Sequence, residues 1–302
     1  MQIPMRRASL VVGAIAMGLT IAAQAPPPKF DSSRAWEHLR QLVAFGPRPA
    51  GSPALDQTRT YMKAQLASTG ATVAEQAWDD QTPLGTVHMV NLIATLPGQK
   101  SDRLVFAGHY DTKRFREFRF VGANDGASSG AFLLELARAL KGRRNALTIE
   151  LLFLDGEEAV TDWAGTDHTY GSRHYVEAAR RDGSLASLRA FVLVDMIADR
   201  DLRIKRDLNS TPWLTDAVWS AALHEKLDAY FVPASTQIED DHLPFVQAGV
   251  PSLDIIDLEY PPWHTADDNL DAVSARSLQI VGDAVLAALP QIEARLTRSG
   301  SR

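Results

Sequence analysis

The chain contains no cysteine among its 302 residues. Disulfides, a thiol nucleophile, thiolate ligands for zinc and lipid attachment to cysteine are therefore all excluded. Long runs of positive charge are missing as well, and 31 Lys and Arg against 37 Asp and Glu give a formal net charge of -6. Nucleic acid is therefore not an expected partner. With 45% hydrophobic residues, the chain can build one large core.

The sequence after residue 25 contains no apolar stretch long enough to cross a membrane, so the first 25 residues are the one candidate for a targeting segment. Those residues begin with Arg6 and Arg7, continue with an apolar run over 10–23, and end on the small-residue sequence Ala23-Gln24-Ala25. The run is shorter than the roughly 20 residues of a membrane span, so a cleaved signal peptide is favoured over an uncleaved anchor. We expect a protein exported to the periplasm or medium, by the Sec or the twin-arginine route. We expect no stable membrane insertion after signal removal, and a mature domain over residues 26–302.

The mature part alternates between helical and strand-like patterns. Two amphipathic helices are expected first, over residues 31–45 and 52–69, followed by two strands over 72–78 and 86–96 that could pair. Four apolar strands then alternate with four helices. The strands are expected over 104–107, 148–154, 191–194 and 250–256, and the helices over 126–140, 172–181, 211–227 and 274–296. This alternation predicts a single α/β domain whose mixed, mostly parallel central sheet has helices on both faces.

Acidic and histidine side chains follow these strands at their carboxyl ends, where open α/β sheets bind ligands. They are His109, Asp111, Glu157, Glu158, Asp195 and His264, with Asp125 in a loop before a helix. Each alone has an ordinary explanation, such as a helix cap for Asp125 or a solvated acidic pair for Glu157 and Glu158. Together, buried carboxylates at one edge would repel one another unless a cation held them. Imidazole and carboxylate ligands favour zinc, whereas calcium would favour more oxygens and no histidine.

Six motifs in this order resemble those of the M28 family of zinc peptidases and cyclases, and within it the glutaminyl cyclases. They are AGHYDTK (107–113), VGANDGA (121–127), FLDGEEA (153–159), YGSRH (170–174), DDHLPF (240–245) and WHTADDN (263–269). They span most of the mature chain. The resemblance implies a zinc aminopeptidase-like fold and zinc-dependent cyclisation of the N-terminal glutamine of peptides or proteins to pyroglutamate, with release of ammonia. We expect a monomer.

The resemblance also implies a role for each matching residue. One zinc per chain is expected on Asp125, Glu158 and His264. The expected catalytic residues are Glu157 as general acid and base, with Asp195 and Asp240 around the reacting amide. Substrate-binding residues are expected to be Trp163, Trp263 and Lys113, while Asp111 orients His109, and Asp241 and His242 fix the local loop. A cis peptide bond is expected between Asp125 and Gly126.

Two alternatives stay open. In a two-zinc aminopeptidase of the same family, His109 and Asp195 would hold a second metal ion, and all those ligand positions are present here. A non-catalytic binding module of the same fold is the second alternative, and the intact ligand set argues against it. The cyclase is favoured by the two tryptophans, Lys113 and the acidic pair at 240–241. Glu239 and Asp254 depart from the polar residues expected in animal cyclases.

Overall fold

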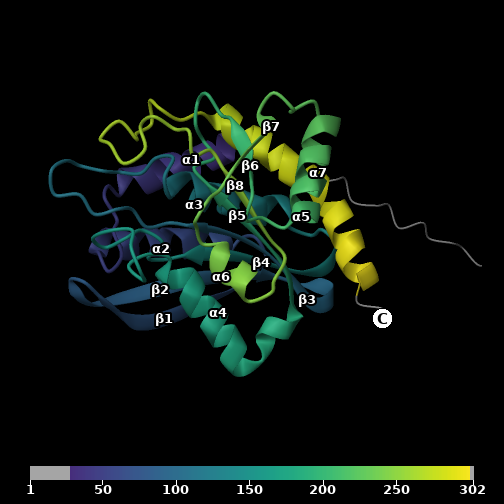
Figure 1. Cartoon of the computed structure of the whole chain (residues 1–302), viewed down its shortest axis with the longest axis horizontal. Coiled ribbons are helices and arrows are strands. Elements are labelled where there is room, and N and C mark those ends of the chain that lie inside the picture. Colours follow the sequence, from purple (N-terminus) through teal and green to yellow (C-terminus); the bar gives the residue numbers. More distant parts are fainter. Residues whose placement is uncertain (1–27, 300–302) are drawn as a thin grey trace, which may run out of the picture.

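A six-stranded mixed sheet lies between two layers of helices (Figure 1). The computed structural model describes residues 28–299, so the signal peptide expected over residues 1–25 lies outside the described residues. The strand order is β1-β2-β4-β3-β5-β8; β1, β2 and β4 pair antiparallel, and the pairs from β4 to β8 are parallel. The strands are β1 (Thr72–Thr82), β2 (Gly85–Leu96), β3 (Gly98–His109), β4 (Asn145–Leu154), β5 (Leu188–Asp195) and β8 (Ser252–Ile256). The expected fold class is confirmed.

Local signals in the sequence fix the first two helices and the strands that follow. The Asp31 side chain caps α1 (Ser32–Ala44) by accepting hydrogen bonds from two backbone amides of its first turn. The Ser52 side chain caps α2 (Pro53–Leu66), which begins with proline in the first turn, where a missing backbone N–H costs nothing. The next two strands pair as expected, and the pairing is antiparallel.

The helices cover both faces of the sheet. One layer contains α1, α3 (Ala127–Ala139), α5 (Pro212–His224) and α7 (Ala275–Ser299), and occupies the upper half of Figure 1. The other contains α4 (Tyr170–Asp182) and α6 (Leu243–Gln247), with the 3-10 helix η1 (Ser184–Ser187). Alternate residues of β3 serve the two layers, because Leu104 and Phe106 join one buried cluster while Val105 and Ala107 join the other. Burial on both faces explains why these strands read as continuous apolar runs.

Four short elements were not expected from the sequence. They are η1, β6 (Ile204–Asp207), β7 (Phe231–Thr236) and α6, and the two strands form a separate parallel pair. The four residues of β6 are buried at the two ends and half-buried in the middle, which is no period-2 pattern, and Pro233 interrupts the strand pattern of β7. The turn that carries Asp240 lies between β7 and α6.

A membrane-spanning helix is not found within residues 28–299, since no helix there combines the needed length with enough apolar character.

Candidate active site

The carboxyl ends of the central strands bring the expected polar residues to one edge of the sheet. Strand β3 ends at His109, β5 ends at Asp195, and Glu157 and Glu158 follow β4 after a short turn. In the ladder, His109 lies opposite Leu154, and Asp195 lies opposite Ile256. A cavity of about 340 Å³ opens at this edge. All the expected site residues except His109 and Asp111 line it: Lys113, Asp125, Glu157, Glu158, Trp163, Asp195, Asp240, Trp263 and His264.

Asp125, Glu158 and His264 form one group of potential metal ligands. One ligand atom from each residue lies within 4.8 Å of the others. The His264 Nε2 atom is 3.3 Å from Asp125 Oδ2 and 3.4 Å from Glu158 Oε1. Burial, and then the charge of Asp125, raises the pKa of Glu158 to about 7. Burial would lower the pKa of His264, but the two carboxylates outweigh it and raise that pKa to about 9.

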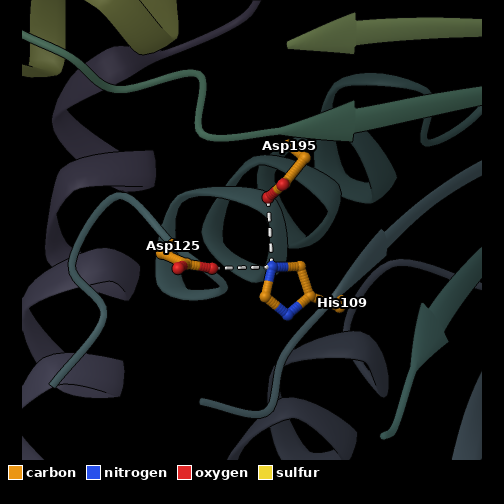
Figure 2. Close-up of side chains that lie close together, drawn as sticks. All are labelled: His109, Asp125 and Asp195. Carbon is orange, nitrogen blue, oxygen red and sulfur yellow. Dashed lines mark hydrogen bonds and ion pairs between the residues drawn. The ribbon is translucent and has the colours of Figure 1, made fainter. Parts of the chain in front are cut away.

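A second group, which shares Asp125, contains His109 and Asp195 (Figure 2). The His109 Nε2 atom lies 3.2 Å from Asp125 Oδ1 and 3.0 Å from Asp195 Oδ1. The two oxygens of Asp125 therefore face different histidines. Burial would raise the pKa of Asp125, but the two imidazoles outweigh it and hold that pKa well below its ordinary range.

The donor atoms of both groups fit zinc, which accepts imidazole nitrogen and carboxylate oxygen and keeps an open position in catalytic sites. The Asp125 Oδ2 atom is buried and has no hydrogen-bond partner among the described residues, although it faces His264 and Glu158. A buried carboxylate oxygen without a hydrogen bond is costly unless a cation meets it. This oxygen therefore marks the place where the residues present would hold a metal ion.

Glu157 lies beside these groups without belonging to either. Its carboxylate is buried at the cavity wall, and Oε2 lies 3.7 Å from His109 Nδ1. Burial, together with the charges of Glu158, Asp240 and Asp241, raises its pKa well above the ordinary value. A carboxyl group with a raised pKa can both accept and return a proton near neutral pH.

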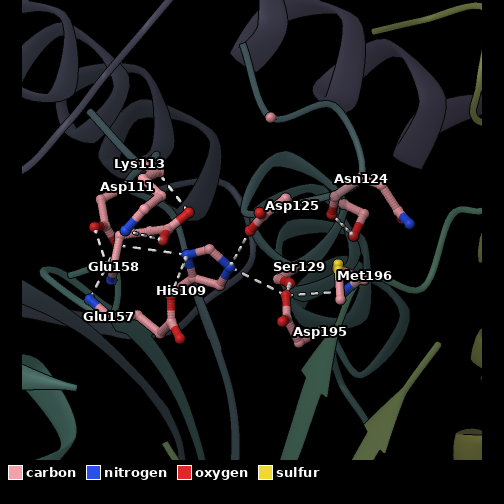
Figure 3. Close-up of polar contacts among 12 residues, drawn as sticks. His109, Asp111, Lys113, Asn124, Asp125, Ser129, Glu157, Glu158, Asp195 and Met196 are labelled. Atoms are coloured by element: carbon pink, nitrogen blue, oxygen red, sulfur yellow. Dashed lines mark hydrogen bonds and ion pairs between the residues drawn. The ribbon is translucent and has the colours of Figure 1, made fainter. Parts of the chain in front are cut away.

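The Asp111 carboxylate binds the backbone of both Glu157 and Glu158 (Figure 3). Its carboxylate accepts the backbone N–H groups of Glu157, at 3.2 Å, and Glu158, at 3.4 Å. Asp111 Oδ1 also lies 3.4 Å from His109 Nδ1, on the side of the ring away from Asp125 and Asp195. This one carboxylate therefore contacts a ring of the second group and the backbone of both glutamates, as the outer partners of metal sites do.

Lys113 lines the cavity and contacts Glu158 and Ala159. Its backbone N–H donates to Glu158 Oε1 at 3.0 Å, and its Nζ donates to Ala159 O at 3.2 Å. The Nζ atom is 3.9 Å from Glu158 Oε2. These contacts support Glu158, whereas the expected role of Lys113 in binding substrate stays a prediction.

Two residues that the sequence did not single out position the Asp125 loop. Arg48 is fully buried, and its guanidinium donates to the carbonyl oxygens of Tyr110, Val121 and Gly122 at 2.9, 2.6 and 3.0 Å. Asp268 accepts the backbone N–H of Asn124 at 2.8 Å and that of Asp125 at 3.2 Å. Asp268 lies in one of the recognised motifs, but Arg48 gave no signal because its partners follow it by more than 60 residues.

The peptide bond between Asp125 and Gly126 is trans, so the expected cis bond is wrong. The chain turns into α3 by another device, which is the positive φ of 90° at Gly126. A Cβ atom at this glycine would lie 2.4 Å from the carbonyl oxygen of Asp111. Only glycine combines this conformation with so close an approach.

Aromatic rings frame the cavity. Trp263 stacks on His264 with ring centroids 4.3 Å apart, and Trp163 stacks on His168 at 4.1 Å. The two tryptophans remain 44% and 39% exposed, so one face of each is free at the cavity. His264 itself has a φ of 54°, a strained value for a non-glycine residue, of the kind that clusters at functional sites.

Comparison with known proteins identifies relatives of the whole domain. Residues 91–289 match the family described as Peptidase family M28. A glutaminyl-peptide cyclotransferase-like protein of Bos taurus is 32% identical over 277 residues, covering 80% of this chain and 70% of that protein. A glutaminyl-peptide cyclotransferase of Drosophila melanogaster is 31% identical, with 78% of this chain and 75% of that protein covered.

Solved structures give a similar picture. A glutaminyl cyclase from an Acidobacteriales bacterium is 40% identical, with a TM-score of 0.86 over 92% of this chain and 100% of that chain. A structure described as a leucine aminopeptidase precursor from Bacteroides thetaiotaomicron is 27% identical, with a TM-score of 0.79 over 87% of this chain and 98% of that chain.

Proposed function

Because the chain belongs to peptidase family M28, and within it to the glutaminyl cyclases, we propose that it converts the N-terminal glutamine of peptides to pyroglutamate and releases ammonia. The observation that carries this proposal is the neighbourhood of Glu157. A buried carboxyl with a raised pKa lines the same cavity as a complete zinc ligand group and two exposed tryptophan faces. Proton transfer, polarisation of a carbonyl and exclusion of water are the three things that this reaction needs.

The proposed metal ion is one zinc per chain, held by Asp125, Glu158 and His264. A zinc ion bound there would polarise the side-chain amide carbonyl of the glutamine as a Lewis acid. Every other step is assigned to the side chains of the protein.

Glu157 would accept a proton from the α-amine as its nitrogen attacks the side-chain amide carbon. It would then return that proton to the departing amide nitrogen, so that a new C–N bond forms, the old one breaks, and ammonia leaves. Asp195 and Asp240, which line the same cavity, would hold the amine and the amide by hydrogen bonds. Both reacting groups belong to one residue, so the pocket chiefly has to keep that residue folded on itself.

Trp163 and Trp263 would exclude water from the carbonyl carbon, which suppresses hydrolysis of the amide to glutamate. Lys113 is proposed to line the pocket floor beside Glu158 rather than to form an ion pair with substrate, because its Nζ donates to Ala159 O at 3.2 Å.

The proposal is tested by mass spectrometry of a Gln-Xaa-Xaa peptide incubated with metal-replete protein. Loss of one ammonia from an intact peptide supports cyclisation. Release of free glutamine without a pyroglutamyl product would instead establish an aminopeptidase.

The aminopeptidase remains the second candidate because of one observation, the complete second ligand group of His109, Asp125 and Asp195. In that reaction these residues would hold a second metal ion, and the metal ions would supply an activated water as the nucleophile for the peptide bond. Elemental analysis separates the two, since we expect about one tightly bound zinc per chain and two would favour the aminopeptidase. A non-catalytic binding module would leave the peptide unchanged, whether or not it holds zinc.

The proposed location is outside the cytoplasm, with a mature N-terminus near Pro26. The basic start, apolar run and small residues before that position support it. N-terminal sequencing of protein from periplasm or medium decides it, and cytosolic protein that keeps Met1 would contradict it.

A further inference from the structure

Three buried polar residues lie behind the pocket and belong neither to its wall nor to a ligand group: Asp207, His242 and Asp254. Asp207 is 4% exposed, and the other two are fully buried. The His242 Nε2 atom is 3.1 Å from Asp207 Oδ2, and its Nδ1 atom is 3.6 Å from Asp254 Oδ2. The proposed reaction uses none of them. Because burying such groups is costly, their presence calls for a function.

Asp207 holds the backbone of Ile238. Its Oδ1 atom accepts the N–H of Ile238 at 3.0 Å and that of Asn209 at 3.1 Å. The side-chain amide of Asn209 then donates to the carbonyl oxygen of Ile238 at 2.6 Å. Both backbone polar groups of Ile238 are therefore fixed by one short segment, Asp207 to Asn209, at the end of β6.

The same carboxylate contacts the chain again at His242. Ile238 and His242 each lie two residues from Asp240, on opposite sides of it. Asp207 therefore holds both ends of the segment 238–242, and the turn between them places Asp240 at the cavity wall. The backbone carbonyl of Asp240 accepts the N–H of Leu243 at 2.9 Å, which keeps the turn tight.

The anchor is in turn attached to the central sheet. The Ser210 hydroxyl donates to Asp207 Oδ2 at 2.7 Å and accepts the N–H of Asp254, in β8, at 2.9 Å. Strand β8 pairs with β5, which ends at Asp195. Burial, and then the charges of Asp240 and Asp195, raises the pKa of Asp254 well above its ordinary value, which favours a neutral group beside these carboxylates.

We propose that Asp207 and His242 are positioning residues that set the place of Asp240 relative to Asp195 in the pocket. This inference rests on the proposed function, in which both of those carboxylates contact the reacting residue. Groups at such a site must be held within about 0.5 Å of their productive place, and a misplacement of about 1 Å can cost 10²-fold in rate.

The test is a double-mutant cycle of Asp207→Asn and Asp240→Asn. Asparagine keeps an acceptor for the Ile238 amide but loses the attraction for His242. We expect Asp207→Asn to lower kcat for cyclisation by about 10- to 100-fold with zinc content unchanged. In the Asp240→Asn background, we expect the same substitution to cost less than about threefold, since residues that act through one another are not additive. Equal losses in both backgrounds would overturn the inference.

Amide hydrogen exchange gives a second measurement that does not depend on activity. Exchange over residues 236–242 should become faster in Asp207→Asn, because the anchored turn opens more often. The control is Glu293→Gln, another buried carboxylate that accepts a backbone amide, that of Ala146 at the start of β4 at 2.8 Å, but does not line the cavity. It should change neither kcat nor exchange over 236–242. Unchanged exchange in Asp207→Asn contradicts the anchor.

If Asp207→Asn does not fold, His242→Gln replaces it in the same cycle, since Asp207 then still holds Ile238. If the unmodified protein does not cyclise glutamine, the proposed function fails, and the exchange measurement alone decides whether the anchor exists.

Discussion

Glu157 and Glu158 are neighbours in the chain, yet their carboxylates face different parts of the site. Glu158 lies 3.4 Å from His264 Nε2, whereas Glu157 lies 3.7 Å from His109 Nδ1 and joins no ligand group. Substitutions at the two residues should therefore have different effects on turnover and on zinc binding.

We expect Glu157→Gln to keep zinc and to lose roughly 10²–10⁴-fold in turnover, because glutamine preserves shape but transfers no proton. Glu158→Ala should instead lose zinc, since it removes a proposed ligand. Metal analysis and kcat are measured on both variants. Near-normal turnover of Glu157→Gln would remove Glu157 from the mechanism.

We expect Trp263→Ala to cut cyclisation strongly and to leave zinc bound, because an aromatic wall that stacks on His264 contributes packing but no ligand. The matched control is Trp213→Ala in α5, where Arg295 covers the ring at 4.6 Å, away from the cavity. The control should lower the thermal midpoint and spare kcat. Equal activity losses in both would mean that Trp263 acts only through stability.

The position of a candidate site residue at the sheet edge could be predicted where an apolar run ends on a polar side chain. The strand before Asp195 and the strand before His109 both do so. Contacts across the chain could not be predicted in this way. Arg48 meets carbonyls 62 to 74 residues away, and Asp207 meets an amide 31 residues away, and no periodic pattern encodes such distances.

At the scale of elements, the turn from Asp125 into α3 is closely packed. Gly126 combines a φ of 90° with a space that a Cβ would overlap. Gly142 also has a positive φ, of 74°, but nothing lies within 4 Å of its Cβ position. Alanine substitutions at these two glycines therefore separate the effect of backbone strain from that of steric crowding.

We expect Gly142→Ala to cost about 1 kcal/mol of unfolding free energy, from backbone strain alone. Gly126→Ala should cost roughly 3 kcal/mol or more and weaken zinc binding, because the Asp125 loop must move. Urea unfolding and zinc titration measure both. A Gly126→Ala protein that matches Gly142→Ala in both would show that the loop is not tightly held.

Long elements could be predicted from the sequence, because burial of one or both faces leaves a pattern of apolar residues over 10 or more positions, as in α3 and β4. The strands β6 and β7 leave no such pattern. Strand β7 keeps only Phe231 buried, and β6 has four residues, so neither burial nor periodicity extends far enough to be read. Strand β3 began earlier than expected, because its first residues, from Gly98, are mostly exposed and polar.

At the scale of the whole molecule, the described part of the chain buries more carboxyl groups than cations around the cavity. Burial raises the pKa of Asp241 and of Asp268 to about 7, as it does for Glu158. In metal-free protein these groups keep their protons up to about pH 7, whereas in the unfolded chain they release them near pH 4. The folded state therefore binds more protons in this window, and stability falls as pH rises through it. The pKa of His264 is raised to about 9, so the loss of stability continues above pH 6.5.

We expect metal-free protein to lose roughly 1–3 kcal/mol of unfolding free energy between pH 6.5 and pH 8.5. His38, His168 and His174, whose pKa values burial lowers, act in the opposite direction, but only below pH 6.5. Zinc competes with these protons and binds more tightly as pH rises, so the zinc-loaded protein should show a flatter curve. Urea midpoints with and without chelator measure this. A metal-free protein that is more stable at pH 8.5 would contradict it.

Asp125 faces both histidines, so the proposed ligands for one metal ion and those for a second would be inherited together. A lineage with this arrangement can exchange one reaction for the other without gaining or losing a single ligand. Selection for a new reaction would then act on the tryptophans and on the turn around Asp240, which can drift while every ligand stays in place. Surveys that classify such proteins by ligand conservation would therefore recover their ancestry, whereas the residues of the pocket wall would record what each descendant does.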